Sequence, residues 1–390
     1  MTKRSEQPCA RSREERSAAA AHITGIDLFC GVGGLTHGLI RGGIRITAGI
    51  DVDATCKFPY EANNDAVFLQ KDVRTLKASD IQPFLGSDTI RLIAGCAPCQ
   101  PFSTYSQKCR RNGDDRKWDL LLDFGRIVDE LQPELVTMEN VPQLLGHKVF
   151  EKFLVSLSGY HLWHNIVECA AYGVPQTRKR LVLLASRLGP VELMAPTHSG
   201  RPVTLRTVIS QLPRLSAGKH SLSDPLHAAC SLSKLNLRRI KASRPGGTWR
   251  DWPPTLRAKC HRRKSGQTYP SVYGRMEWGG TAPTITTQCF GFGNGRFGHP
   301  EQNRAISLRE AAIIQTFPND YRFIPGNSTP KFNVLGRLIG NAVPVRLGEV
   351  VAETLTRHVQ TLGTAVDSPS RGNGEAPEVT LSMGHLRGGG

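Results

Sequence analysis

A cysteine in a short proline-bounded loop is the first residue whose setting suggests chemistry. Residues 95–103 read GCAPCQPFS and follow the apolar run TIRLIAG, which predicts a buried strand. Prolines restrict the backbone on both sides of Cys99, so the thiol is held at a strand end. A thiol presented in this way is well placed to act as a nucleophile.

A second cysteine in the same loop gives the pair two alternative interpretations. Cys96 and Cys99 are three residues apart, as in zinc sites and redox pairs. A zinc site of this type needs a second ligand pair at close spacing, and none follows in the sequence. A redox pair normally opens a helix, whereas Pro101 breaks the segment after Cys99. We therefore expect no metal site and take Cys99 as the candidate nucleophile.

An acid and two arginines stand at the ends of later predicted strands. Glu139 follows ELVTM, and Arg178 and Arg180 belong to QTRKR, directly before LVLLAS. Taken singly, Glu139 could cap a helix and the arginines could be solvated. Because strand ends of one sheet share an edge, we expect the thiol, the carboxylate and the two guanidinium groups to meet as a catalytic set.

A glycine-rich turn precedes this set. Residues 26–35 read IDLFCGVGGL and join an apolar run to an amphipathic segment. Glycines there let a ligand approach the backbone at the carboxyl end of a strand. The spacing does not match the dinucleotide fingerprint, so nicotinamide binding is not favoured. A simple tight turn is the alternative.

Two aspartates extend the predicted ligand site. Asp51 ends RITAGID, and Asp72 ends AVFLQKD. An acid after the second strand suits ribose hydroxyls, and one after the third can accept a hydrogen bond from an adenine amino group. Singly, each could be a turn or cap residue. Their order along the chain indicates an adenosine site without a phosphate clamp.

The elements that would position these residues alternate along the chain. Over residues 23–190, short apolar runs alternate with helix-like stretches such as DLLLDFGRIVDELQ, which predicts an α/β fold with a doubly wound, mostly parallel sheet. Residues 191–329 are rich in Pro, Gly and Arg and predict a smaller irregular domain. A regular spacing of apolar residues returns over residues 330–361. The ends, 1–22 and 362–390, are expected to be flexible tails.

The charge of the chain is strongly one-sided. A formal net charge of +17 favours a polyanionic partner, and nucleic acid first. Residues 234–275 contain a single acid, Asp251, among many lysines and arginines. Four aromatic residues are interleaved with them: Trp249, Trp252, Tyr269 and Tyr273. We expect a groove for phosphates and bases here, and a solvated basic face is the alternative.

Export and membrane insertion are not favoured. No run of about 18 apolar residues occurs, and the first residues lack the apolar core of a secretory signal. Ten scattered cysteines do not form the dense framework of a small secreted domain. We expect a cytoplasmic, nucleoid-associated monomer with reduced thiols and no contact with a membrane.

Taken in order, the motifs resemble the cytosine-5 DNA methyltransferase family, in its bacterial modification type. The matching segments are DLFCGVGG, the two aspartates, PCQ at 98–100, ENV at 139–141, QTRKR at 176–180 and GNAVP at 340–344. The resemblance spans about residues 24–350. It departs from the family at two points, because Asp51 stands where many members have Glu and Ala97 where a second proline is common.

The resemblance implies a domain arrangement and a cofactor. A Rossmann-like domain at 23–190 would bind S-adenosylmethionine, residues 191–329 would recognise the target, and residues 330–361 would return to the catalytic domain. Duplex DNA would lie between the domains, and a restriction endonuclease acting on the same site is an expected partner. The family's cofactor contacts would fall on Phe29 for adenine, Gly31 and Gly34 for the methionine portion, Asp51 for ribose, and Asn341 from GNAVP.

The resemblance also implies a covalent mechanism. Cys99 would add as a thiolate to carbon 6 of a cytosine flipped out of the duplex, which activates carbon 5 for methylation. Glu139 would share a proton with ring nitrogen 3. Arg178 and Arg180 would hold the base carbonyl and a phosphate and keep Cys99 ionised. Residues 103–118 resemble the family's mobile loop, which would close over the base.

Two other functions share parts of this pattern. A tRNA cytosine-5 methyltransferase uses the same motifs, and the long basic region favours DNA over it. A catalytically silent DNA-binding regulator would have the same fold, but intact Cys99 and Glu139 argue against it. No motif indicates which DNA sequence would be the target.

Overall fold

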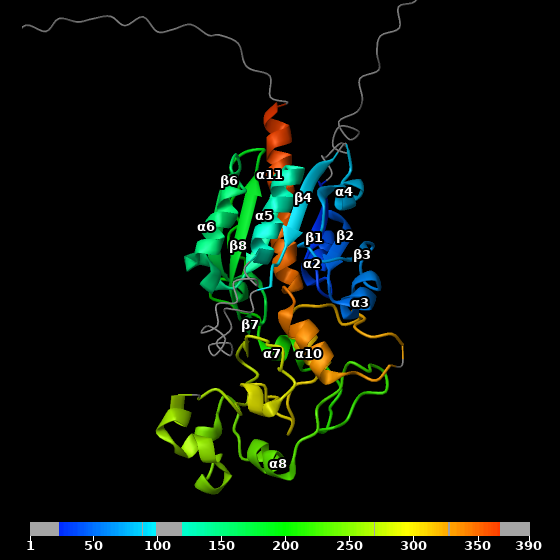
Figure 1. Cartoon of the computed structure of the whole chain (residues 1–390). Coiled ribbons are helices and arrows are strands. Elements are labelled where there is room, and N and C mark those ends of the chain that lie inside the picture. The colour runs from blue at the N-terminus through cyan, green and yellow to red at the C-terminus, as the bar shows by residue number, and fades with distance from the viewer. Residues whose placement is uncertain (1–22, 88, 99–118, 269, 327, 367–390) are drawn as a thin grey trace, which may run out of the picture.

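A seven-stranded sheet lies at the centre of the computed structural model, which describes residues 23–87, 89–98, 119–268, 270–326 and 328–366 (Figure 1). In sheet order the strands are β3 (Val67–Gln70), β2 (Arg45–Asp51), β1 (Ile23–Leu28), β4 (Ile90–Gly95), β5 (Leu135–Asn140), β8 (Lys179–Ser186) and β6 (His161–Glu168). The first five run parallel, and β8 is antiparallel to both its neighbours. The expected α/β fold with a mostly parallel sheet is therefore confirmed.

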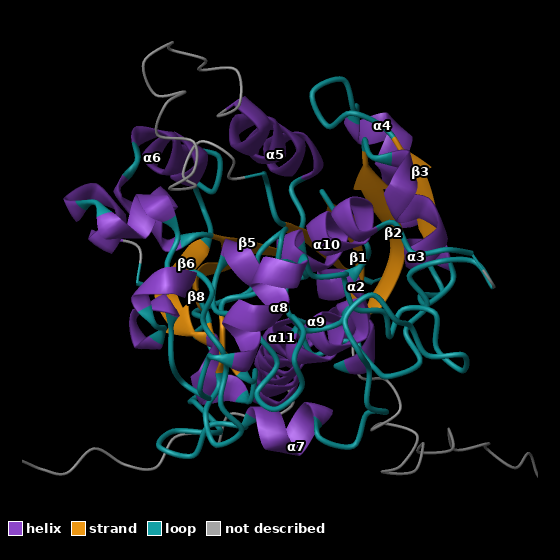
Figure 2. Cartoon of the chain, turned by 90° about the horizontal axis from the view of Figure 1, so that it is seen from below, coloured by secondary structure: helices purple, strands orange, loops and turns teal. Residues whose placement is uncertain are grey.

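Helices cover both faces of this sheet. In Figure 2, α5 (Asp119–Leu131) and α6 (Lys148–Val155) lie on one side, and α2 (Gly34–Arg41) and α11 (Val345–Val366) lie on the other. Side chains alternate along β8 between the two cores, with Leu181 and Leu183 facing the first and Val182 and Leu184 facing the second. Burial on both faces explains why the central strands read as nearly continuous apolar runs.

The last helix returns to the sheet beside the first one. A Cβ added at Gly38 of α2 would lie 2.3 Å from the Val345 carbonyl oxygen, and one added at Gly34 would lie 2.3 Å from that of Val343. The helices therefore approach this closely only because α2 has no side chain at these positions. Their packing brings the GNAVP segment against the glycine turn after β1.

Residues 191–329, which we call the small lobe, are built mainly from loops. Its regular elements are α7 (Leu205–Ile209), α8 (Lys234–Lys241), β9 (Ala282–Pro283) and α9 (Leu308–Ile314), and α10 (Phe332–Asn341) follows it. β9 pairs in parallel with β7 (Gln176–Thr177), just before β8. Figure 1 shows the small lobe below the edge at which the parallel strands end. The lobe therefore faces the edge where the sequence predicts the site.

Short helices fill the remaining connections. They are α3 (Lys57–Glu61), α4 (Ala78–Ile81) and the 3-10 helices η1 (Ala54–Cys56), η2 (Gln82–Phe84), η7 (Pro142–Gly146), η8 (Cys169–Tyr172), η9 (Trp249–Asp251), η10 (Pro254–Leu256), η11 (Lys259–Arg262), η12 (Lys264–Thr268) and η13 (Phe292–Asn294). Among the residues that the structure describes, no helix combines the length and apolarity needed to cross a bilayer.

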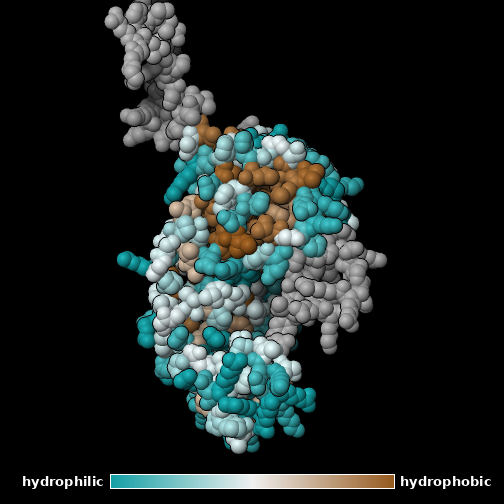
Figure 3. Space-filling view, turned by 90° about the vertical axis from the view of Figure 1, so that its left-hand side faces the viewer, coloured by the Kyte–Doolittle hydropathy of each residue, from teal (hydrophilic) through white to brown (hydrophobic). Residues whose placement is uncertain are grey.

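The hydropathy of the outer surface differs between the sheet domain and the small lobe. Figure 3 shows an apolar area on the side of the sheet that ends in β6, where Val155, Leu162 and Ile166 are exposed. The lower part of the same view, over the small lobe, is hydrophilic. On the face shown in Figure 3, the small lobe thus presents a mainly polar surface, as its basic sequence predicts.

Candidate active site

An ion pair between Glu139 and Arg180 lies at the edge of the sheet that faces the small lobe. Glu139 stands near the end of β5 and Arg180 near the start of the antiparallel β8, so both strands deliver their side chains to this edge. Arg180 Nε lies 2.8 Å from Glu139 Oε1, and both side chains are largely buried. A carboxylate held in this way has a fixed position and one oxygen turned elsewhere.

That second oxygen contacts Cys96. The Cys96 thiol donates a hydrogen bond to Glu139 Oε2 over 2.9 Å, directly after the end of β4. The adjoining backbone is fixed because Asn140 Nδ2 donates to the Ala97 carbonyl oxygen over 3.0 Å. Sequence reasoning treated Cys96 only as a partner of Cys99 and missed its contact with Glu139. The position of Cys96 at the strand end is the signal that could have indicated it.

The expected nucleophile, Cys99, lies outside the described residues, as does the expected closing loop at 103–118. Its assignment therefore stays a prediction from the sequence. The described chain ends at residue 98, two residues after Cys96. Cys96 is itself in contact with Glu139, so the segment that leads to Cys99 leaves directly from the site.

Arg178 has surroundings different from those of Arg180. Its guanidinium is buried and donates hydrogen bonds to the carbonyl oxygens of Ile285, over 3.1 Å, and Ala342, over 3.3 Å. Burial, together with the charge of Arg180, lowers the pKa of Arg178 to about 10. These contacts join the start of β8 to the small lobe and to the GNAVP segment. Arg178 thus connects these segments, and the direct contact with base or phosphate that the sequence suggested stays a prediction.

The glycine turn after β1 combines a tight backbone with open space. Phe29, Gly31 and Gly33 all have positive φ angles, of 59°, 53° and 85°. The Gly31 amide donates to Asp51 Oδ2 over 2.9 Å. A Cβ added at Gly31 would meet no atom of the described residues within 4 Å, in contrast to Gly34, which packs against the returning chain. A ligand can therefore approach the backbone at Gly31.

Asp51 fixes the turn and keeps acceptor capacity. Its other oxygen, Oδ1, accepts a hydrogen bond from the Asp53 amide over 2.9 Å. Burial raises the pKa of Asp51, and backbone hydrogen bonds, chiefly from the Asp53 and Gly31 amides, act in the opposite direction. Each carboxylate oxygen can accept more than one hydrogen bond. Hydroxyl donors of a ligand could thus bind an oxygen that is already oriented.

The remaining two cofactor candidates differ in setting. Asp72 pairs with the guanidinium of Arg74 at 2.5 Å, and this local pair engages both of its oxygens. Asn341 ends α10 and is exposed, next to Ala342, whose side chain borders Gly34. The structure therefore brings Asn341 close to the glycine turn. A ligand that binds Asp72 would have to share its oxygens with Arg74.

A buried acid beneath the turn was not predicted. Asp27 of β1 is fully buried, and its Oδ2 accepts a hydrogen bond from Thr36 Oγ1 over 2.7 Å. Burial raises the pKa of Asp27 to about 7, although the Thr36 contacts oppose the shift. A single acid within the apolar run ITGIDLF was the available signal.

Comparison with known proteins identifies the family. The chain matches the family described as C-5 cytosine-specific DNA methylase over residues 23–357. It belongs to this family. The chain is 50% identical over 343 residues to the type II methylase M.HgiDII of Herpetosiphon aurantiacus, covering 86% of this chain and 96% of the relative. It is 29% identical over 350 residues to the type II methyltransferase M1.HphI of Haemophilus parahaemolyticus, covering 86% and 87%.

Solved structures agree with this C-5 cytosine methylase assignment at the level of the fold. A prophage-encoded chain of Escherichia coli superposes with a TM-score of 0.66 at 23% identity, covering 87% of this chain and 99% of that one. The S. pombe Dnmt2 methyltransferase gives a TM-score of 0.60 at 17% identity, with coverage of 87% and 99%. The sequence-based recognition of the family is confirmed.

The aromatic residues of this methylase's basic segment are placed differently from the expectation. Trp249 and Trp252 are 3% and 1% exposed and belong to a small core that includes Phe292. Rings this deeply buried cannot stack on DNA bases, so these two rings do not line the expected groove for phosphates and bases. They build the small lobe, and the arginines around them make its surface.

Proposed function

We propose that the chain is a DNA (cytosine-5-)-methyltransferase that transfers a methyl group from S-adenosylmethionine to carbon 5 of a flipped cytosine in duplex DNA. The observation that carries the proposal is the Glu139 carboxylate, held by Arg180 and Cys96 at the edge from which the Cys99 segment leaves. The family membership and the type II names of the relatives support a DNA substrate. They do not favour the tRNA enzyme.

Each residue of the proposed site has a separate role in the reaction. The Cys99 thiolate forms a bond to carbon 6, and the electron pair displaced from the ring double bond makes carbon 5 nucleophilic. Glu139 shares a proton with ring nitrogen 3 and stabilises the charge that gathers there. Arg180 keeps the Glu139 carboxylate in place. A base then takes the carbon 5 proton, the electrons of that carbon–hydrogen bond restore the ring double bond, and the Cys99 thiolate departs.

The glycine turn fits S-adenosylmethionine, which supplies the electrophilic methyl group. The open space at Gly31 and the oriented oxygens of Asp51 suit an adenosine with free ribose hydroxyls. Phe29, Gly34 and Asn341 border the same turn, and Asp72 stays the candidate for the adenine amino group. Residues 23–190 and 330–361 would form the cofactor-binding part, and residues 191–329 the part that selects the target.

The type II names of the relatives also support the proposal that this enzyme is the methyltransferase of a restriction-modification system. In that setting, a restriction endonuclease would cut the sequence that this enzyme protects. Sequencing of bisulfite-treated DNA from cells that express the chain would then show methylation at one short recurrent sequence. Digestion by an endonuclease of that specificity would fail on the same DNA.

A trapped covalent adduct tests the mechanism directly. Fluorine in place of the carbon 5 proton blocks its removal, so duplex DNA with 5-fluorocytosine at the target should give a denaturation-resistant complex when S-adenosylmethionine is present. Peptide mapping should place the adduct on Cys99, and Cys99→Ser should give none because a hydroxyl is far less ionised than a thiol. An adduct on Cys96, or full methylation by the serine variant, would refute this mechanism.

A further inference from the structure

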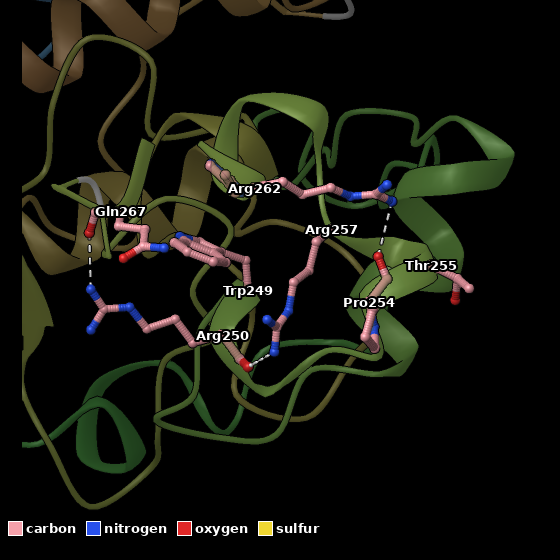
Figure 4. Close-up of a pocket in the computed structure, with 8 residues that line it drawn as sticks. Trp249, Arg250, Pro254, Thr255, Arg257, Arg262 and Gln267 are labelled. Carbon is pink, nitrogen blue, oxygen red and sulfur yellow. Dashed lines mark hydrogen bonds between the residues drawn. The ribbon is translucent and has the colours of Figure 1, made fainter. Parts of the chain in front are cut away.

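A basic cavity of about 610 Å³ opens on the small lobe, between residues 249 and 267 (Figure 4). Arg250, Arg257 and Arg262 line it, together with Trp249 and His261. Among the described residues that line it, none is acidic. The cavity therefore concentrates positive charge at a hollow in the surface, away from the edge that holds Glu139.

The three guanidinium groups are fixed without being neutralised. Arg250 donates to the Gln267 carbonyl oxygen over 2.9 Å, and Arg257 donates to the Arg250 carbonyl oxygen over 2.8 Å. Arg262 donates to the carbonyl oxygen of Pro254 over 3.0 Å. A neutral carbonyl acceptor orients a guanidinium and leaves its full charge in place.

No carboxylate in the described part of the chain forms an ion pair with these arginines. The one acid of the basic segment, Asp251, pairs instead with Arg244 at 2.9 Å. Each arginine has further N–H donors beyond those used for carbonyl oxygens. The cavity thus has several oriented donors and an uncompensated charge, which is the requirement for an anion with acceptor oxygens only.

An aromatic wall keeps the cavity in shape. The Trp249 and His261 rings stack with centroids 4.3 Å apart and planes 21° from parallel. The Arg250 guanidinium lies over the Trp249 ring at 5.7 Å from its centroid. His261 is 6% exposed, and its Nδ1 has no hydrogen-bond partner among the described residues. One side of the cavity is therefore rigid and carries an unsatisfied polar atom.

We propose that this cavity binds a backbone phosphodiester of the DNA substrate, so that Arg250, Arg257 and Arg262 hold the duplex independently of its sequence. The proposal rests on the proposed function, since it takes duplex DNA as the ligand. A phosphodiester offers only acceptors, matches guanidinium geometry and is repeated along every duplex. The cavity exceeds the size of one phosphate and leaves room for the adjoining sugars.

The test compares charge-neutral variants on two duplexes, one with the methylated sequence and one without it. Arg250→Gln combined with Arg262→Gln removes two exposed guanidinium groups, and Arg238→Gln is the matched control from the same basic segment outside the cavity. The double variant should weaken binding of both duplexes by the same factor, about tenfold. A plot of log binding constant against log salt concentration should become less steep, by about 1 unit of slope. The control should change neither quantity by as much.

Three outcomes would overturn the proposal. The salt slope could stay unchanged, the loss could be confined to the methylated sequence, or inorganic phosphate could bind in a variant-sensitive way while duplex binding is unaffected. The last result would assign the cavity to a small anion. Bisulfite sequencing of DNA treated with the unaltered chain separates this question from the proposed function, because a chain that makes no 5-methylcytosine but shows the expected salt slopes fails only as a methyltransferase.

Discussion

Replacing Glu310 by Gln should destabilise the folded chain by about 3 to 5 kcal/mol, the cost of leaving a buried charge without its partner. Glu310 of α9 accepts two hydrogen bonds from the Arg304 guanidinium, both of 2.7 Å, and a third from the Ser307 amide over 2.7 Å. Both side chains are essentially inaccessible to solvent. The glutamine amide cannot accept the bidentate pair, and the Arg304 charge stays buried.

The pKa of Glu310 gives a second measure of the same interaction. Burial acts to raise it, but the hydrogen bonds and charge of Arg304 outweigh burial and lower the pKa from 4.5 to about 2. That shift corresponds to about 3 kcal/mol of stability. Because the folded pKa is depressed, the contribution is complete above about pH 4.5 and is lost as the pH falls toward 2. Burial also lowers the pKa of neighbouring His299 to about 4, so His299 is neutral at pH 7.

Urea unfolding at pH 7, 5 and 4, followed by circular dichroism, measures both effects. The gap between the unaltered chain and Glu310→Gln should be constant from pH 7 to 5 and should shrink at pH 4. Glu301→Gln is the matched control, because Glu301 pairs with Arg214 at an exposed site and its loss should cost less than about 1 kcal/mol. Equal losses in the two variants, or a gap that grows at low pH, would refute the reasoning.

Three other changes test the cofactor turn, the helix contact and the held carboxylate. Asp51→Ala should weaken S-adenosylmethionine binding at least about tenfold in calorimetry without unfolding the chain, and unchanged affinity would remove Asp51 from the site. Gly38→Ala should lower the melting temperature, because its Cβ would lie 2.3 Å from a backbone oxygen of α11. Gly146→Ala should not lower it, because its Cβ would have no atom within 4 Å in the part of the chain that the structure describes. Cys96→Ala should lower the methylation rate and alter its pH profile, since a donor to Glu139 is lost, while 5-fluorocytosine trapping on Cys99 should persist; an unaltered profile would make Cys96 a packing residue only.

The central part of the sheet was predictable because its strands are buried on both faces. The runs ITGIDL, RITAGID and IRLIAG are apolar almost throughout, and each forms a strand at that place. The turn after the first run was predictable for a similar reason, since glycines are needed where φ is positive, as at Gly31 and Gly33. Local sequence is informative wherever local backbone geometry or burial decides the structure.

The two arginines show where that logic fails. Alternation along one continuous strand would put Arg178 and Arg180 on the same face. The strand is instead broken at Arg178, between β7 and β8. The break turns one guanidinium to the carbonyl oxygens of Ile285 and Ala342 and leaves the other beside Glu139. The carbonyl partners lie more than 100 positions along the chain, beyond any local window.

The exposure of the tryptophans in the basic segment could not be predicted for the same reason, because distant residues cover them. Arginines surround Trp252 in the sequence, so composition indicates an exposed ring. In space, Phe292 covers one side of it and the Arg239 guanidinium lies 5.5 Å from its centroid. Arg239 is itself buried and donates to the Leu256 carbonyl oxygen over 2.9 Å, so it covers the ring from inside the lobe. A basic, aromatic stretch can therefore be the core of a small lobe as well as its outer surface.

The junction between the sheet and the small lobe is built from residues at alternate positions of one short segment, 176–180. Gln176 donates to the Gln315 side chain over 2.7 Å and accepts from the Ile285 amide over 3.1 Å, and both glutamines are fully buried. Arg178 adds its own contacts to the same junction two residues later. Arg180 then contacts Glu139. Because these residues stand at alternate positions of one short segment, the backbone that holds Arg180 beside Glu139 is the same backbone that is hydrogen-bonded to the small lobe.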